Sequence, residues 1–299
     1  MNPPYDRTKK YMLVLSPRIG DSLVTLVLAH NLVKNNYNVD VFGDFAFQLA
    51  SWFPELTIYP LTGLTAEQVN HYDVIIEEFK NSSISDFKTM KPLLCIHELE
   101  YFREGFHMVE IQMEVCRRLF GIEQPTMTNG LVLPSDLQSR KYQQRVIIHA
   151  LATVPLREWP LNRYIALAKE LNQNGFECHF IASPKERERI QPVLDAGLSV
   201  PIFSSLSETA RFIAESGYFI GNFSGIAHLS SNLGIPTLGL AVRPGEYRLW
   251  RPYWAKGSVI LPPSWLISRQ LKEAFWKKCI SVKKVKNCFL RLAHSKETL

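Results

Sequence analysis

Apolar, strand-like segments alternate with amphipathic, helix-like segments along most of this chain. In the first 125 residues the strand-like segments are 11–16, 39–42, 56–59, 73–77 and 93–97. Helix-like segments lie between several of them, and a longer one is expected at 108–120. Strands that alternate with helices in this way form parallel, doubly wound sheets. The alternation therefore predicts an α/β fold.

The same pattern starts again after residues 125–142, a stretch rich in Pro, Asn, Gly and Ser that resembles a linker. The expected strands of this second series are 145–149, 178–182, 201–203, 218–220 and 237–241, with helices between them. A chain of 299 residues also exceeds the usual size of a single core. We expect domains at 1–135 and 142–262, followed by a tail at 263–299.

Composition excludes several classes of protein. The chain is 46% hydrophobic and 21% charged, which is typical of a folded, soluble protein. It has no apolar run near the ~18 residues that span a bilayer, and its N-terminus has no signal-peptide pattern, so a cytoplasmic location is expected. The five cysteines are widely spaced and form no CxxC pair, so neither a disulfide framework nor a zinc site is expected.

The net charge of +6 is concentrated in the tail, where residues 264–299 hold nine Lys or Arg and two Asp or Glu. Apolar residues recur among these lysines as they do in an amphipathic helix. We expect this apolar face to be buried against the folded part of the chain. The basic face would then be free to rest on an anionic inner-membrane surface, as a peripheral protein does. No nucleic-acid recognition motif accompanies the basic residues, so no nucleic-acid partner is expected.

The stretch 218–236 (YFIGNFSGIAHLSSNLGIP) has the form strand, glycine-bearing turn, helix. This form presents free backbone N–H groups and a helix N-terminus, which together bind phosphate well. An ordinary turn capped by Ser224 would have the same form. His228 lies one helical turn further on. It could donate a hydrogen bond to a phosphate or a sugar, or it could be a histidine whose hydrogen bonds are satisfied within the helix face.

Asp21 directly follows Gly20 at the start of the first predicted helix. A carboxylate there, at the carboxyl end of the first strand, suits a general base. Asp is also a common N-cap residue, and the sequence leaves both interpretations open.

Further candidates follow the strands of the second series: His149, Thr153, Arg157, Glu186, Asn222 and Arg243. A permanent guanidinium at Arg157 suits a pyrophosphate, and a carboxylate at Glu186 suits a ribose diol. The Arg and aromatic residues of 243–252 suit a sugar or a base. Three of these candidates also have an ordinary structural explanation: Arg157 as a surface Arg, Glu186 as a helix-start Glu, and the loop 243–252 as loop packing.

Together these stretches resemble glycosyltransferase family 9, the lipopolysaccharide heptosyltransferase family. The similar segments are Ile19-Gly20-Asp21, then 157–160 (REWP, where the family has Lys-x-Trp-Pro), then 223–228 (FSGIAH, where the family has Asp-Ser/Thr-Gly-x-x-His), and the loop 243–252. Their order and spacing cover most of the chain, from about residue 11 to residue 252.

The resemblance implies a GT-B fold, in which two Rossmann-like domains face each other across a cleft. In such folds a C-terminal helix often crosses back, so the resemblance also implies that the tail packs on the N-terminal domain. It implies inverting transfer of heptose or a related sugar from a nucleotide-diphosphate donor, most often ADP-linked, to a lipopolysaccharide or surface-glycan acceptor. Asp21 would be the base, and Arg157, Ser224, Gly225 and His228 would hold the diphosphate and sugar. Glu186 would hold the ribose. No metal and no cofactor are implied.

Two positions depart from the family pattern: Phe223 replaces its donor-motif Asp, and Arg243 stands where Gly is usual. Phe cannot accept a hydrogen bond. Either the donor is a different one, or Asn222 takes over part of the role, or the protein binds a nucleotide sugar or glycan without transferring it. A nucleotide-sugar epimerase or hydrolase of similar fold is a third alternative.

Overall fold

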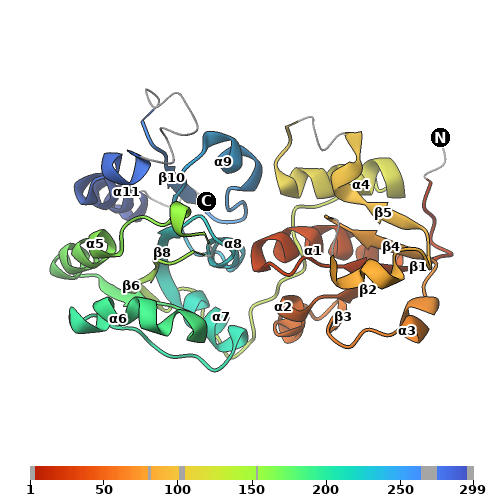
Figure 1. Ribbon diagram of the computed structural model, residues 1–299, viewed down its shortest axis with the longest axis horizontal. Helices are drawn as coiled ribbons and strands as arrows, with labels where there is room; N and C mark the ends of the chain where they lie inside the picture. The colour runs from red at the N-terminus through yellow and green to blue at the C-terminus, as the bar shows by residue number, and fades with distance from the viewer. Residues whose placement is uncertain (1–3, 80–81, 101–104, 153, 264–274, 295–299) are drawn as a thin grey trace. The chain divides into compact units, whose positions relative to one another are not determined.

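The computed structural model describes residues 4–79, 82–100, 105–152, 154–263 and 275–294. The chain divides into two compact units, Met1–Pro134 and Ser135–Leu299, each built around one parallel sheet (Figure 1). The predicted α/β class is therefore correct for both units.

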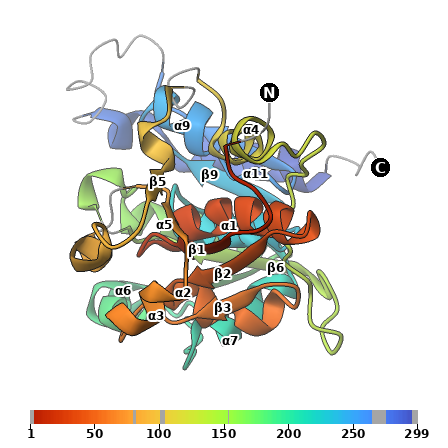
Figure 2. The ribbon, with the colours of Figure 1, turned by 90° about the vertical axis from the view of Figure 1, so that its right-hand side faces the viewer.

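The first unit holds a five-stranded sheet with the order β3-β2-β1-β4-β5. Helices α1 and α4 pack against each other on it (Figure 2). Its strands and helices are β1 Lys10–Val14, α1 Ile19–Lys34, β2 Asn38–Phe42, α2 Asp44–Phe47, β3 Thr57–Tyr59, α3 Ala66–Asn70, β4 Val74–Glu77, β5 Leu93–Cys95 and α4 Met108–Phe120, with short 3-10 helices at Ala50–Trp52, Ser82–Phe87 and Ile96–Glu98.

The second unit holds a five-stranded sheet with the order β10-β9-β8-β6-β7. Its strands and helices are β6 Tyr142–His149, α5 Leu161–Gln173, β7 Glu177–Phe180, α6 Arg187–Asp195, α7 Leu206–Ala214, β8 Ser216–Asn222, α8 Gly225–Asn232, β9 Thr237–Leu240, α9 Pro244–Trp250, β10 Gly257–Ile260 and α11 Val282–His294, with 3-10 helices at Pro155–Arg157 and Pro184–Glu186.

Both sheets reverse their direction of winding at one place. In the first sheet the chain moves from β1 outward to β2 and β3, and then returns to the other side of β1 to form β4 and β5. In the second sheet it moves from β6 to β7 and returns to form β8, β9 and β10 on the other side. Ligands of such sheets bind at this switch point, beyond the carboxyl ends of the strands.

One expectation about the second sheet was wrong, and one of its strands was missed. Residues 201–203 form no strand, and the chain there contributes only an isolated bridge between His179 and Ser199. The sheet is completed instead by β10, which pairs in parallel with β9. Residues 257–260 (GSVI) contain too few apolar residues to be recognised as a strand from their pattern.

The tail was also expected to pack elsewhere. The buried side chains of its described part, among them Trp276, Val285 and Phe289, belong to the core of the second unit. Helix α11 packs against α5 and β10 (Figure 1), and the Phe289 ring lies edge-on to Phe176 and Tyr218 at 5.0 and 5.3 Å. The expected packing of this face on the N-terminal domain is therefore wrong, because its apolar stripe completes the core beside β10.

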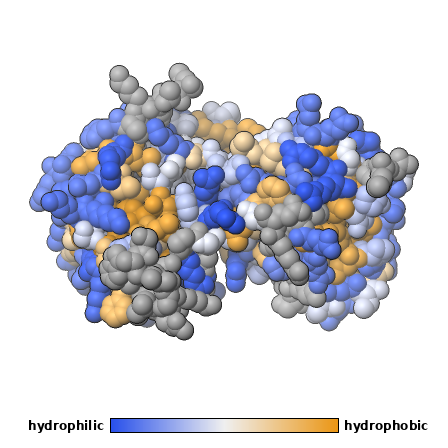
Figure 3. Space-filling view, turned by 90° about the horizontal axis from the view of Figure 1, so that it is seen from above, coloured by the Kyte–Doolittle hydropathy of each residue, from blue (hydrophilic) through white to orange (hydrophobic). Residues whose placement is uncertain are grey.

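The surface drawn in Figure 3 is largely hydrophilic on both units, with smaller hydrophobic areas between the polar ones. Among the described residues, no helix has both the length and the apolar character needed to span a bilayer.

Candidate functional site

The switch point of the second sheet brings the ends of β6 and β8 together. His149, the last residue of β6, is the register partner of Gly221 in β8. A side chain at 221 would place its Cβ 2.8 Å from the carbonyl oxygen of His149, closer than real contacts allow. Glycine at this position therefore lets the two strands end side by side.

Ser224 follows β8 and is the N-cap of α8, as expected, but its hydroxyl makes no capping bond. Ser224 Oγ instead lies 3.2 Å from His149 Nδ1. The first helical bonds of α8 run from the N–H groups of Ala227 and His228 to the Ser224 carbonyl. The N–H groups of the two preceding residues, Gly225 and Ile226, therefore point out of the helix end, where an anion binds favourably.

His149 is 8% exposed, and burial lowers the pKa of its imidazole below the ordinary value. The carboxylates of Glu186 and Glu158 act in the opposite direction but are the weaker influence. His149 is therefore neutral at neutral pH and can share one hydrogen bond with the Ser224 hydroxyl without adding charge to the turn.

Asn222 does not reach the surface of this turn. Its side chain is 0% exposed. Its Oδ1 accepts bonds from the Trp159 N–H at 3.0 Å and the Tyr164 hydroxyl at 2.9 Å, and its Nδ2 donates to the Ala150 carbonyl at 2.6 Å. The expected donor contact by Asn222 is at odds with this arrangement, because the buried side chain ties α5 to the sheet and both of its polar atoms are bonded within the core.

Phe223 and His228 lie together at the start of α8. Their rings meet edge to face with centroids 5.9 Å apart, and the His228 ring meets Trp250 of α9 in the same way at 6.5 Å. Phe223 is half-buried, and His228 is 4% exposed. The turn therefore has an aromatic side next to its polar helix end.

The other candidates of the second unit lie on separate loops. Arg157 is exposed at the end of the 3-10 helix Pro155–Arg157, and Arg243 is the half-buried N-cap of α9. Glu186 is partly committed, since its Oε2 accepts bonds from the N–H and hydroxyl of Ser183 at 2.8 and 2.7 Å. Thr153 lies outside the described residues.

In the first unit, Asp21 is in the first turn of α1, but the N-cap of that helix is Arg18. The capping interpretation of Asp21 is therefore wrong. Its Oδ2 accepts a bond from the Ser16 hydroxyl at 3.1 Å and lies 4.0 Å from the Arg18 guanidinium. The side chain is 15% exposed, and burial raises the pKa of its carboxyl above the ordinary value. Gly20, just before it, is buried within the turn.

Sequence reasoning missed a second carboxyl at this edge, Glu78, which directly follows β4 and is 1% exposed. Its Oε2 lies 2.6 Å from the hydroxyl of Thr25 in α1, and its Oε1 lies 3.4 Å from Gln112 Nε2 in α4. Burial raises the pKa of Glu78 well above its ordinary value, and the charge of Asp21 adds to the effect. Two consecutive acids after the apolar run 74–76 are the signal that the sequence offered.

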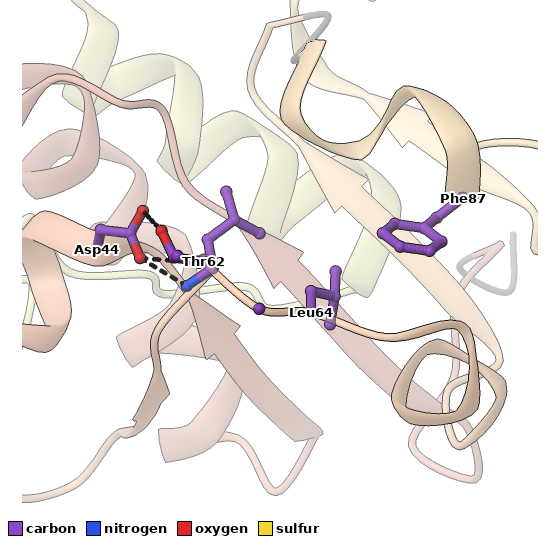
Figure 4. A pocket seen from close by; sticks show the side chains of 6 residues that line it. Asp44, Thr62, Leu64 and Phe87 are labelled. Atoms are coloured by element: carbon purple, nitrogen blue, oxygen red, sulfur yellow. Dashed lines mark hydrogen bonds between the residues drawn. The ribbon is translucent and has the colours of Figure 1, made fainter.

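A small pocket of about 220 Å³ lies at the same edge of the first unit, beside the loops that follow β2 and β3 (Figure 4). Asp44 and Thr62 line it together with Leu64 and Phe87. The Asp44 carboxylate accepts bonds from the Leu61 and Thr62 N–H groups and from the Thr62 hydroxyl, each at 2.9 Å. Asp44 therefore fixes the loop that forms one wall of the pocket.

Within the described part of the chain, no group of three or more His, Cys, Asp or Glu residues lies close enough together to hold a metal ion.

Comparison with known proteins identifies the family. The sequence profile of glycosyltransferase family 9 (heptosyltransferase) matches residues 91–271, which is more than half of the chain. The chain belongs to glycosyltransferase family 9. The matched range contains the edge of the second sheet but not Asp21. No curated protein sequence matches the chain significantly.

Solved structures similar to this family 9 protein cover nearly its whole length. Heptosyltransferase WaaC of E. coli with ADP has a TM-score of 0.72 at 16% identity, covering 95% of this chain and 99% of its own. ADP-heptose lipopolysaccharide heptosyltransferase II of E. coli has a TM-score of 0.73 at 19% identity, covering 96% and 99%. The iron-containing, dodecameric glycosyltransferase TibC of enterotoxigenic E. coli has a TM-score of 0.64 at 12% identity, covering 98% and 78%.

At these identities the similarity concerns the fold, and it confirms the expected GT-B class. The family membership confirms the expected resemblance and supports a sugar-transfer activity. The ADP of WaaC and the iron of TibC belong to those two proteins, and a shared fold at these identities carries neither over to this chain.

The neutral state of His149 leads to a prediction about stability. A group whose pKa is lowered by folding contributes stability above its unfolded pKa, and this stability is lost as the pH falls through the folded pKa. Between about pH 7.5 and pH 5.5, which bracket the ordinary imidazole pKa of about 6.5, we expect the free energy of unfolding to fall more in the natural protein than in His149→Asn.

Urea unfolding at the two pH values measures this difference. His71→Asn, at an exposed position, is the control and should lose as much stability as the natural protein. An identical pH dependence in His149→Asn and the natural protein would contradict the neutral, buried state of His149.

Proposed function

We propose that this family 9 protein is an inverting glycosyltransferase that moves heptose or a related sugar from a nucleotide-diphosphate donor to a lipopolysaccharide or surface-glycan acceptor. The observation that carries the proposal is the edge of the second sheet, where the helix end at Ser224 and Gly225 meets His149 at the switch point, inside the range that the family profile matches. The ADP complex of WaaC favours an ADP-linked donor.

The donor diphosphate would bind at the N-terminus of α8. The N–H groups of Gly225 and Ile226 and the Ser224 hydroxyl are hydrogen-bond donors at this helix end, and the helix dipole favours negative charge there. Arg157 and Arg243 are permanent cations on neighbouring loops and suit the charge that develops on the leaving diphosphate. Such a site needs no metal to stabilise the leaving group, and we propose none.

Asp21 would act as the general base. Its carboxylate takes the proton of the acceptor hydroxyl while that oxygen attacks the anomeric carbon and the bond to the diphosphate breaks. Burial of Asp21 raises its pKa, which makes the carboxylate a stronger base than an exposed Asp. The Ser16 hydroxyl, at 3.1 Å, holds the carboxylate in one orientation.

Phe223 supports a second candidate, a relative that binds a nucleotide sugar or glycan without transferring it or that uses a different donor. The family's carboxylate is absent at this position, and Asn222 is fully bonded within the core. The Phe223 ring packs on His228 instead. The turn is therefore more apolar than the family pattern implies.

The basic face of the tail suits a membrane-bound acceptor. Lys278, Lys283, Lys284 and Arg291 are exposed in the described part of the tail, while most of its apolar residues, though not Phe275, are packed into the core of the second unit. Each cation near an anionic surface contributes about 1 kcal/mol. We propose a peripheral contact with the anionic inner membrane through this face.

Asp21→Asn tests the base. We expect it to lower transfer by at least about 10²-fold, the usual contribution of a general base, and to leave the affinity for the nucleotide sugar unchanged. In the natural protein, the acidic limb of the kcat/KM profile should lie above the ordinary Asp pKa of about 3.9. Asp86→Asn, at an exposed position of the same unit, is the control. Full activity of Asp21→Asn would contradict the assignment.

Phe223→Asp tests the two candidates. In a panel of ADP-, GDP-, UDP- and dTDP-linked sugars, we expect at least one to raise the melting temperature of the natural protein. A ligand at 100 times its Kd adds about 2.7 kcal/mol to the free energy of unfolding. Phe223→Asp should increase the shift with ADP-heptose, because it restores a carboxylate at the turn, while Phe203→Asp on an outlying loop should not. Turnover of any donor by the natural protein would exclude the non-catalytic alternative.

Vesicle sedimentation tests the membrane contact. We expect the natural protein to sediment with vesicles that contain anionic lipid and not with purely zwitterionic ones, and the double substitution Lys283→Glu with Lys284→Glu to abolish binding. High salt should have the same effect. Equal binding to both kinds of vesicle would contradict an electrostatic contact.

A further inference from the structure

Glu78 lies at the switch point of the first sheet, beside the residue proposed as the base. Strands β1 and β4 are neighbours there, with Val14 the register partner of Glu77. The chain after β1 leads to Asp21, and the residue after β4 is Glu78. Two carboxyls are therefore held at one sheet edge, both largely removed from water.

Thr25 connects them. Its hydroxyl lies 3.0 Å from the backbone carbonyl of Asp21 and 2.6 Å from Glu78 Oε2. A hydroxyl has one proton to donate. A threonine within a helix ordinarily gives that proton to the carbonyl four residues earlier, which here is Asp21. The 2.6 Å contact then needs a proton from Glu78.

The surroundings of Glu78 agree with this distribution of protons. The groups that face its carboxyl are Thr25 and, through its charge, Asp21 from α1, and the amide of Gln112 from α4, at 3.4 Å. On the β5 side, the Cys95 thiol contacts the backbone carbonyl of Glu78, 3.9 Å away. In the described part of the chain, no Lys or Arg pairs with this carboxyl.

We infer that Glu78 is a positioning residue for the base, a neutral acid whose proton bonds to Thr25, so that Thr25 can hold the Asp21 carbonyl and fix the first turn of α1. This inference rests on the proposed function of Asp21. The neutral form has a second effect, because it leaves Asp21 without a negative neighbour that would oppose its ionisation. Burial raises the pKa of Glu78 more strongly than the hydrogen bond with Thr25 lowers it, so burial favours the same form.

The neighbouring Glu77 provides a matched contrast. It is 0% exposed and forms an ion pair with Lys88, Nζ to Oε1, at 2.9 Å. Glu77 and Glu78 are thus consecutive buried acids, of which one has a cation beside it and the other has a hydroxyl and an amide.

Glu78→Gln and Glu77→Gln test the inference without any substrate. A group whose pKa is raised by folding makes stability fall as the pH rises toward the folded pKa. Gln has no such dependence and can donate to Thr25. The melting temperature of Glu78→Gln relative to the natural protein should therefore increase from about pH 5 to pH 8, on the order of 2 °C or more per pH unit. Glu77→Gln should melt lower than the natural protein at neutral pH, because it leaves Lys88 without its carboxylate.

Carboxyl NMR and kinetics test the connection to Asp21. We expect the pKa of Asp21 to be the same in Glu78→Gln as in the natural protein. Transfer by Glu78→Gln should stay within about twofold of the natural rate and lack the alkaline decline that ionisation of Glu78 causes. Thr25→Val should lower kcat and leave the donor KM unchanged.

The possible failures are distinct. If the melting temperature of Glu78→Gln relative to the natural protein stays constant or falls between pH 5 and pH 8, Glu78 is ionised and the inference is overturned. A lower pKa of Asp21 in Glu78→Gln than in the natural protein would have the same meaning. An alkaline limb that persists in Glu78→Gln would overturn the connection to the base. Full activity of Asp21→Asn would instead refute the proposed function, while the unfolding measurements would still report the protonation of Glu78.

Discussion

The structure depends on one constraint of parallel sheets, the reversal of winding between two neighbouring strands. At β1 and β4, and again at β6 and β8, the connections leave the sheet in opposite directions, so no crossover covers the ends of those strands. The helix that follows β1 or β8 therefore begins with backbone N–H groups that no crossing segment covers. In the second unit this produces the open N-terminus of α8, and in the first it places Asp21 on the first turn of α1. Both candidate sites are consequences of the same topology.

Polar side chains are buried at both sheet edges, and the free-energy cost of burying them is avoided in a different way at each residue. A buried charge without a partner is costly, so buried groups are fully bonded, paired or neutral. Asn222 is fully bonded, Glu77 is paired with Lys88, and His149 is kept neutral by burial. Asp21 is the exception that a base requires, since it stays partly exposed and has the Ser16 hydroxyl beside it. At the edge of the first sheet, Asp21 is therefore left as the partly exposed carboxylate that can be ionised, and this is the residue proposed as the base.

The sequence predicted those parts of the fold and site that depend on local periodicity. Strand and helix alternation located both sheets, and the strand-turn-helix form located Ser224 and Gly225. It did not predict the role of Asn222, because a polar residue at the end of a strand has the same pattern whether it faces a ligand or the core. Glu78 was missed for a related reason, since only the packing of α1 and α4 shows which side of β4 it faces. The tail was misplaced because an amphipathic stripe specifies that a face is buried but not the partner that buries it.

The burial of Asn222 changes the meaning of Phe223. Had Asn222 faced the turn, its amide could have replaced the carboxylate that the family pattern places at 223, and the donor could have stayed the same. Both polar ends of Asn222 are instead used to join β8 to the start of α5, and the Phe223 ring lies against His228. Asn222, the residue before Phe223, therefore supplies no compensating acceptor. The substitution replaces a hydrogen-bond acceptor at this point of the turn with an apolar ring, so the donor that we propose would have to present an apolar face to Phe223.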